Sequence, residues 1–266
     1  MEAIKRIKKW IENGDETAML NLSGLNITRL PELPLNLKKL DCSSCCYIRE
    51  LPELPESLQT LKCYNCPIEK LPKLPKSLQV FYCYLCPIKE LPELPANLQT
   101  LDCSFCENLK KLPKLPKSLQ ELYCSHCPIE KLPELPKSLQ VLFCSSCLKL
   151  KKLPELHESL QELKCLYCSE LKEIPKLPPN LQSLYCSYCI IKELPELPES
   201  LQVLFCSSCL KLKKLPKLPE SLQELKCSSC SELKKLPELP PKLQELDCYG
   251  CYIKSLPAIL PFKVRL

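Results

Sequence analysis

Leucine and proline recur at fixed intervals along this chain. The frame L-x-x-L-x-C-x-x-C-x-I-x-x-L-P-x-L-P-x-x returns at a nearly constant interval of about 20 residues. Self-similarity at this period predicts a solenoid, in which each repeat buries its apolar side against its neighbours. The copies begin at Leu37, Leu58, Leu78, Leu98, Leu119, Leu139, Leu160, Leu181, Leu201, Leu222 and Leu243.

The x-L-x-C tract of each repeat predicts a short strand. In the copy at residues 58–77, Leu61 and Cys63 alternate with Thr60 and Lys62, so the first pair faces the core and the second pair faces outward. The Leu-Pro-x-Leu-Pro segment excludes a helix, because proline lacks an N–H and restricts the residue before it. We therefore expect parallel strands on one side of the solenoid and extended, polyproline-like segments on the other.

The first residues follow a helical period instead. In residues 2–12 the apolar side chains share one helical face, basic side chains lie mostly on the other, and Asn13-Gly14 ends the helix. We expect residues 1–16 to hold a helix that caps the open end of the solenoid. A membrane- or partner-binding helix is the alternative. The apolar face consists of Ala3, Ile4, Ile7, Trp10 and Ile11.

The repeats extend over residues 17–257, and residues 258–266 are expected to form a C-terminal tail. The first repeat, residues 17–36, has Leu22 and Leu25 where the eleven later repeats have cysteine. Both positions therefore accept an apolar side chain, and a buried thiol behaves in the same way.

The repeat frame resembles that of the leucine-rich repeat family, L-x-x-L-x-L-x-x-N/C-x-L. Here cysteine stands at the third leucine and at the asparagine position. The Leu-Pro-x-Leu-Pro segment and the short period resemble bacterial effectors of the YopM and IpaH kind and related repeats in giant viruses. The resemblance implies a leucine-rich repeat solenoid with a parallel β-sheet on the concave face, an extended convex face and one N-terminal capping helix. Some such effectors carry a ubiquitin-ligase domain after the repeats, but we do not expect that activity here.

Charge and composition narrow the function classes. Lysine and arginine number 37 against 31 acidic residues, with both signs mixed throughout, so we expect no nucleic-acid partner. No apolar stretch is long enough to cross a bilayer and no signal peptide is recognisable, which predicts no membrane span and a cytoplasmic location in the producer or a host cell. No nucleotide-binding loop or catalytic triad stands out, so we expect a non-catalytic monomer without a cofactor.

Cysteine is unusually frequent, with 23 residues, of which 22 form eleven C-x-x-C pairs. Stacked pairs could hold zinc or Cu(I), and disulfides within a repeat are another possibility. We favour a structural ladder of buried thiols without metal, because Leu22 and Leu25 occupy the same two positions. The two cysteine columns are Cys42, Cys63, Cys83, Cys103, Cys124, Cys144, Cys165, Cys186, Cys206, Cys227 and Cys248, and then Cys45, Cys66, Cys86, Cys106, Cys127, Cys147, Cys168, Cys189, Cys209, Cys230 and Cys251.

Aromatic residues collect at positions expected on the concave face. Exposed rings offer large, rigid contact area, although rings also suit strands and stack between repeats for purely structural reasons. We expect this face to bind a protein or peptide that the sequence does not identify. The candidate residues are Tyr64, Tyr82, Tyr84, Phe105, Tyr123, Phe143, Tyr167, Tyr185, Tyr188, Phe205 and Tyr249.

Overall fold

The computed structural model describes residues 2–253 and 263–265. By its internal contacts the chain divides into two compact units, residues 1–128 and 129–266. Each unit is built from the same repeat, in which one short strand per repeat pairs in parallel with the strand of the next. The predicted solenoid of parallel strands, with one N-terminal helix, is confirmed.

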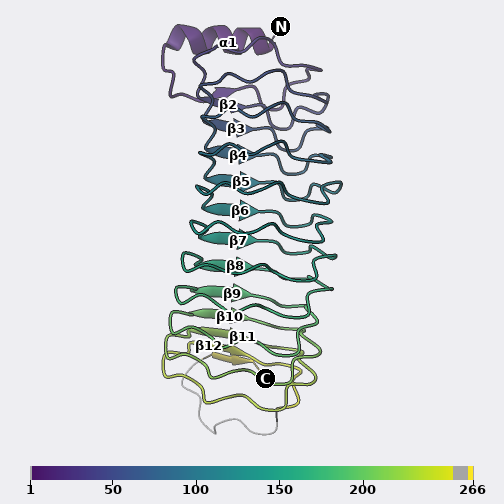
Figure 1. The fold of residues 1–266 in the computed structure, drawn as a ribbon, viewed down its shortest axis with the longest axis vertical. Coiled ribbons are helices and arrows are strands. Elements are labelled where there is room, and N and C mark those ends of the chain that lie inside the picture. Colours follow the sequence, from purple (N-terminus) through teal and green to yellow (C-terminus); the bar gives the residue numbers. More distant parts are fainter. Residues whose placement is uncertain (1, 254–262, 266) are drawn as a thin grey trace. The chain divides into compact units, whose positions relative to one another are not determined.

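The first unit contains a helix followed by parallel strands, each paired with its successor in the chain. The helix lies beside the first strand (Figure 1). The elements are α1 (Glu2–Asn13), β1 (Leu20–Asn21), β2 (Lys39–Asp41), β3 (Thr60–Lys62), β4 (Val80–Tyr82), β5 (Thr100–Asp102) and β6 (Glu121–Tyr123).

In its described residues the second unit contains parallel strands, each paired with its neighbour in the chain. Its last strand, residues 263–265, lies within the expected C-terminal tail and pairs with the preceding strand; the expected boundary at 257 lies outside the described residues. The elements are β7 (Val141–Phe143), β8 (Glu162–Lys164), β9 (Ser183–Tyr185), β10 (Val203–Phe205), β11 (Glu224–Lys226), β12 (Glu245–Asp247) and β13 (Lys263–Arg265).

The alternation of buried and outward side chains within strands β2 to β12 follows the prediction. In β3 the middle residue, Leu61, is fully buried, whereas Thr60 and Lys62 are half-buried on the outer surface. Cys63 directly follows the strand, is also fully buried, and donates its backbone N–H to the oxygen of Tyr82 in the next repeat (2.9 Å). The hydrogen-bond ladder between repeats therefore continues past the end of the strand.

The Leu-Pro-x-Leu-Pro segments return the chain to the next strand without helix, as predicted. In the copy after β3, Leu71 and Leu74 point into the core, with 7% and 4% of their surface exposed. Leu78 N donates to Pro75 O (3.1 Å), which closes a turn before the next repeat. Proline thus shapes the return, and leucine anchors it to the core.

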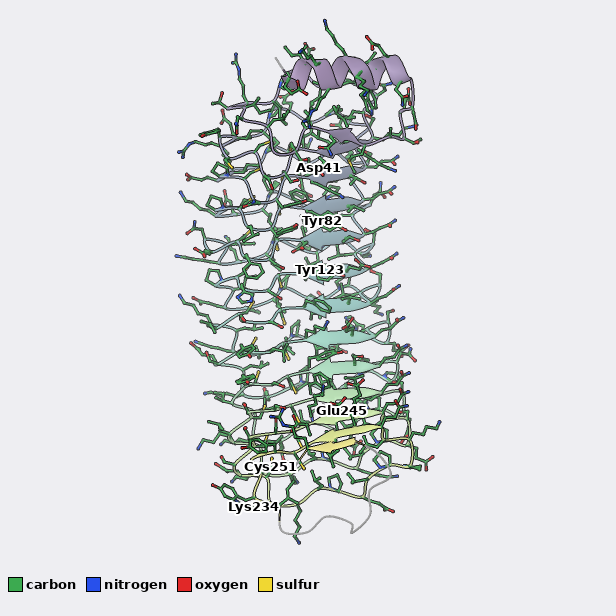
Figure 2. The ribbon with its side chains drawn as sticks, turned by 180° about the vertical axis from the view of Figure 1, so that it is seen from behind. Asp41, Tyr82, Tyr123, Lys234, Glu245 and Cys251 are labelled. Carbon is green, nitrogen blue, oxygen red and sulfur yellow. The ribbon has the colours of Figure 1, made fainter. Side chains whose placement is uncertain are left out.

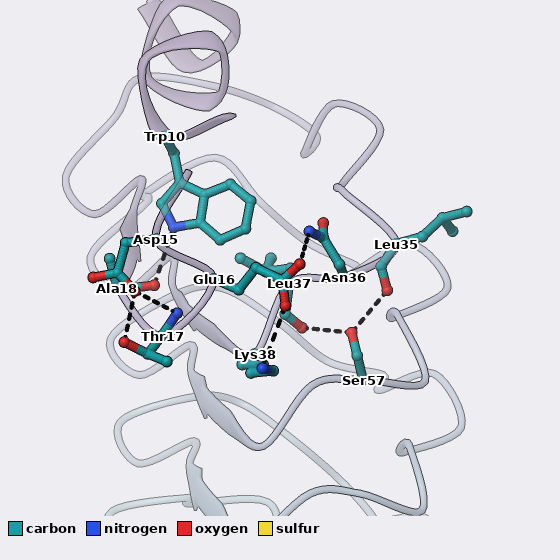
Figure 3. A network of polar contacts seen from close by, with 10 residues as sticks. All are labelled: Trp10, Asp15, Glu16, Thr17, Ala18, Leu35, Asn36, Leu37, Lys38 and Ser57. Carbon is teal, nitrogen blue, oxygen red and sulfur yellow. Dashed lines mark hydrogen bonds and ion pairs between the residues drawn. The ribbon is translucent and has the colours of Figure 1, made fainter. Parts of the chain in front are cut away.

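Helix α1 packs on the first repeat through Ala3, Ile7 and Trp10, which are buried. The indole Nε1 of Trp10 donates to Ala18 O (3.0 Å; Figure 3). Ile4 and Ile11, which the helical period places on the same face, are 50% and 56% exposed. The buried stripe is therefore narrower than the apolar face.

Polar side chains also join the first repeats to one another (Figure 3). Glu16 accepts a hydrogen bond from Asn36 Nδ2 (2.7 Å) and lies 3.3 Å from Lys38 Nζ. The hydrogen bond from Asn36, followed by the contact with Lys38, lowers the pKa of Glu16. Ser57 Oγ donates to the carbonyl oxygens of Leu35 and Leu37 (2.7 and 2.8 Å). Serine before the strand thus links neighbouring repeats, and Ser77 and Ser118 repeat the arrangement at their own positions.

Candidate functional site

The first and third residues of strands β2 to β12 form an outward surface that we call the sheet face. The candidate aromatic residues divide between this face and the turn that follows each strand. Five lie on strands, at Tyr82, Tyr123, Phe143, Tyr185 and Phe205. The other six lie in the turns, at Tyr64, Tyr84, Phe105, Tyr167, Tyr188 and Tyr249.

In the second unit, lysine and aromatic side chains interleave on the sheet face. Lys164 Nζ lies 4.0 Å from the ring centroid of Phe143 and 4.8 Å from that of Tyr185. Tyr185 meets Phe205 edge to face with centroids 4.9 Å apart, and Lys226 Nζ lies 4.5 Å from the Phe205 centroid. Cation–π contacts of this kind orient the ammonium groups and hold the rings in place.

Carboxylates complete the lysine environment on this face. Lys164 Nζ lies 2.9 Å from Glu162 Oε1, and Lys226 Nζ lies 3.5 Å from Glu245 Oε1. The side chains of both pairs are about one third exposed, with values of 29% to 31%. The lysines therefore remain partly accessible while their geometry is restrained from two sides.

The tyrosines on the sheet face of the first unit lie beside charged side chains of both signs, and Lys62 Nζ is 5.9 Å from the ring centroid of Tyr82. Tyr123 Oη donates to Glu121 Oε2 (3.3 Å). Burial, followed by the negative charge of Glu121, raises the pKa of Tyr82. Burial also raises the pKa of Asp102, although hydrogen bonds from Ser104 oppose that rise. Figure 2 shows Tyr82 and Tyr123 over the strands.

The turn aromatics stack between neighbouring repeats. Tyr64 and Tyr84 have centroids 4.3 Å apart and an interplanar angle of 7°. Tyr167 and Tyr188 have centroids 4.2 Å apart, and both are nearly half exposed. Burial, followed by the neighbouring Tyr64, raises the pKa of Tyr84 to about 12. The turns thus present flat, paired rings beside the sheet face.

His126 joins this arrangement, although the sequence analysis did not select it. Its ring stacks on Phe105 with centroids 4.1 Å apart. Both residues occupy the same place in consecutive repeats, two residues after the first cysteine, and both have positive φ. The equivalent positions of Phe105 and His126 in consecutive repeats could have predicted this stacking from the sequence.

The cysteine columns lie in the core. The first column and the second column are both buried, apart from Cys251, which is half-buried. The Sγ of Cys66 donates to Cys42 O (3.4 Å) and that of Cys86 to Cys63 O (3.2 Å). The second unit repeats the contact from Cys168 to Cys144 (3.2 Å), Cys189 to Cys165 (3.1 Å), Cys209 to Cys186 (3.2 Å) and Cys230 to Cys206 (3.2 Å).

Burial raises the pKa of many thiols in the two columns, whereas hydrogen bonds with neighbouring thiols lower the pKa of Cys106 and of Cys251. Burial raises the pKa of Cys66 to about 11 and that of Cys86 and Cys189 to about 12. In the first column burial raises the pKa of Cys63 and Cys165 well above the ordinary value. Thiolate is the nucleophile and the metal ligand, so the cysteines with a raised pKa are held in their unreactive form.

Comparison with known proteins places the repeats in a family. A leucine-rich repeat family model matches residues 118–139. YopM from Yersinia enterocolitica is similar over 99% of this chain and 67% of its own, with 31% identity and a TM-score of 0.74. YopM from Yersinia pestis, described as a leucine-rich effector protein, is similar over 97% of this chain and 84% of its own, with 30% identity and a TM-score of 0.74.

The chain belongs to the leucine-rich repeat family. A domain of InlJ from Listeria monocytogenes, described as including a cysteine ladder, has the same fold. It is 22% identical over 86% of this chain and 60% of its own, with a TM-score of 0.53. Comparison with curated protein sequences gives no significant match.

The leucine-rich repeats of the second unit also form a polar groove that the sequence analysis missed. It has a volume of about 420 Å³ and is lined by Gln140, Ser159, Gln161, Asn180, Gln182 and Ser200. Glutamine follows the first leucine of most repeats, and this regularity was visible in the sequence. The lining side chains are all uncharged amides and hydroxyls.

Two further features bear on the expected functions of this leucine-rich repeat chain. Within residues 2–253 and 263–265, no three histidine, cysteine, aspartate or glutamate side chains lie where they could hold a metal ion; the expected absence of metal stays a prediction. The described part of the chain also contains no helix with the length and hydrophobicity of a membrane span.

Proposed function

We propose that this leucine-rich repeat chain is a non-catalytic scaffold that binds a protein or peptide through the sheet face and the adjoining turn aromatics. The observation that carries the proposal is the interleaving of Lys164 and Lys226 with aromatic rings in the second unit. Rings and cations held in place lose little conformational entropy when a partner binds.

The first unit also combines aromatic rings with charges of both signs, since Lys62 Nζ lies 5.9 Å from the ring centroid of Tyr82. Tyr82 and Tyr123 lie among Asp102 and Glu121, and Tyr123 already donates to Glu121. A partner would therefore meet a different arrangement of rings, carboxylates and ammonium groups in each unit. Such differences between repeats give a binding surface specificity.

We propose that the buried cysteines are structural. Second-column thiols such as Cys66 and Cys168 fill the core and satisfy a backbone carbonyl of the preceding repeat, the task that asparagine performs at that position in the family frame. The InlJ domain described as including a cysteine ladder supports this role by analogy. No observation favours the zinc or Cu(I) alternative. Buried thiols of this kind fit a reducing cytoplasm, in the producer or a host cell.

Combined replacement of Tyr82, Tyr84, Tyr123 and Phe143 by serine tests the binding surface. None of these four side chains is in the leucine and cysteine core, so the far-ultraviolet circular dichroism spectrum should be unchanged. Binding to a partner identified by cross-linking and mass spectrometry should weaken by about 1 to 2 kcal/mol for each anchoring ring.

The matched control changes four exposed side chains in the Leu-Pro-x-Leu-Pro segments, Lys73, Glu93, Lys114 and Glu134, with reversal of charge. This set should bind like the unmodified chain. If the control set loses the partner while the aromatic set keeps it, the binding surface lies on the proline-rich side and the proposal fails.

A further inference from the structure

Each repeat of the second unit continues past its second cysteine into an exposed loop. We call residues 148–152, 169–173, 190–193, 210–214 and 231–235 together the loop band. Successive loops are in contact, since Ser169 Oγ donates to Leu148 O (3.3 Å) and Ser231 Oγ donates to Leu210 O (3.5 Å). The loop band is thus a surface separate from the sheet face.

Aliphatic side chains protrude from this band. Leu148 and Leu210 are each 57% exposed and Ile190 is 40% exposed, although each is followed within two residues by a buried leucine or isoleucine. They occupy the same place in their repeats, directly after the second cysteine. Tyr252 holds that place in the last described repeat and is 69% exposed.

Lysines surround these apolar tips. The loop band contains ten lysines, all of them exposed, against four glutamates. The corresponding loops of the first unit, residues 46–50, 67–70, 87–90 and 107–111, contain five basic and four acidic residues. Charges that look evenly mixed along the sequence are therefore grouped on one surface of the second unit, because coiling brings equivalent positions of successive repeats together.

Lysine and apolar side chains lie next to each other in the band. Lys234 Nζ lies 4.7 Å from the ring centroid of Tyr252 and donates to Ser231 O (2.8 Å). Figure 2 shows Lys234 away from the strands, in contrast to Glu245 on β12. Among these lysines, Lys211 pairs with Glu232 at 3.5 Å and Lys214 with Glu193 at 3.8 Å. The glutamates are fewer, so a positive excess remains.

The chemistry of the band favours a lipid surface over a protein. Protein interfaces are enriched in aromatic residues and arginine, and the loop band contains no arginine and, unlike the sheet face, no aromatic residue. Anionic lipids attract clustered lysines at about 1 kcal/mol each, and apolar tips add affinity by entering the acyl boundary. A tyrosine beside a lysine suits the headgroup level.

We propose that the loop band of the second unit binds the surface of an anionic membrane, with Leu148, Ile190 and Leu210 entering the lipid and the lysines contacting phosphate and carboxylate headgroups. This peripheral contact leaves the sheet face available to a partner.

Sedimentation with vesicles tests the proposal on the full chain. The chain should pellet with vesicles of phosphatidylcholine and phosphatidylserine, and not with vesicles of phosphatidylcholine alone. Raising the salt concentration from low to about 1 M should release it, because the Debye length falls to about 3 Å. Equal sedimentation with both vesicles, or with neither, would overturn the proposal; in the latter case the lysines serve an acidic macromolecule instead.

Two variants locate the contact. Replacing Lys149, Lys151, Lys211 and Lys213 by glutamine should lower the partition coefficient by at least about tenfold. Replacing Leu148, Ile190 and Leu210 by serine should lower it while leaving the salt dependence in place. Both sets are exposed, so circular dichroism should show an unchanged fold.

Two controls exclude other basic surfaces. Glutamine at Lys70, Lys89, Lys110 and Lys111 removes the same number of charges from the first unit and should leave partitioning unchanged. Serine at the exposed Ile4 and Ile11 tests helix α1, which is also basic and amphipathic. If either control abolishes vesicle binding while both band variants still bind, the loop band is not the membrane contact.

Discussion

Ser208 has a backbone conformation that glycine adopts more easily than serine does. Its φ is 55°, in the left-handed region. The residue at the equivalent position of the other repeats also has a positive φ. Two repeats have glycine there, Gly24 with φ 68° and Gly250 with φ 70°. The backbone N–H of Ser208 donates to Ser228 O (2.7 Å), which ties the turn to the next repeat.

We expect Ser208→Gly to stabilise the chain. A side chain in the left-handed region costs about 1 to 2 kcal/mol, and glycine removes that cost while keeping the N–H that donates to Ser228. Glycine also loses more backbone entropy on folding, which offsets about 0.5 to 1 kcal/mol. The net gain in the free energy of unfolding is therefore about 0.5 to 1 kcal/mol.

Gly24→Ala should act in the opposite direction. A Cβ at this position meets no atom within 4 Å, so the cost is that of the backbone alone. We expect a loss of about 1 kcal/mol in the free energy of unfolding. The direction of this change in the free energy of unfolding tests the reasoning, because alanine at an ordinary glycine position often stabilises a protein.

Urea unfolding followed by circular dichroism measures both effects. The midpoint should rise for Ser208→Gly and fall for Gly24→Ala, with the slope of the transition unchanged. Ser208→Ala is the control, because it removes the hydroxyl and keeps the Cβ, and its midpoint should stay close to that of the unmodified chain. The reasoning fails if Ser208→Gly lowers the midpoint, or if it and Ser208→Ala raise it equally.

The remaining predictions concern the thiols and the cap. Protein purified with reductant should contain no stoichiometric zinc, copper or iron and should titrate near 23 thiols once denatured; several metal ions per chain would contradict the structural role. The folded pKa of Cys66 is about 11, above its ordinary 9.0. The protonated Cys66 thiol therefore contributes its full stability below pH 9, and this contribution is lost as pH rises through 11. The midpoints of urea unfolding measured from pH 7 to 11 should fall only above pH 9. Removing residues 1–14 should lower the melting temperature or the solubility, because Trp10 and Ile7 no longer cover the edge under Leu20. An unchanged, monomeric product would instead make α1 an interaction segment.

The hydrophobic pattern determined which residues of each repeat are buried. Leu61 and Cys63 lie inside and Thr60 and Lys62 outside, because a strand alternates its side chains and the period places every copy in the same environment. Leu22 in the first repeat predicted the burial of the cysteines by the same reasoning.

Only the tertiary structure decided features that depend on contacts between repeats. Ile4 and Ile11 share the apolar face of α1, yet they remain exposed because the first repeat covers a narrower stripe. The left-handed turn at Ser208 is imposed by the hydrogen bond to the next repeat, since serine has no preference for it. Lysines at equivalent positions of neighbouring repeats, such as Lys213 and Lys234, share one surface only after the chain has coiled. The local sequence pattern therefore determines which side chains of a repeat are buried, whereas the stacking of repeats determines which side chains share a surface.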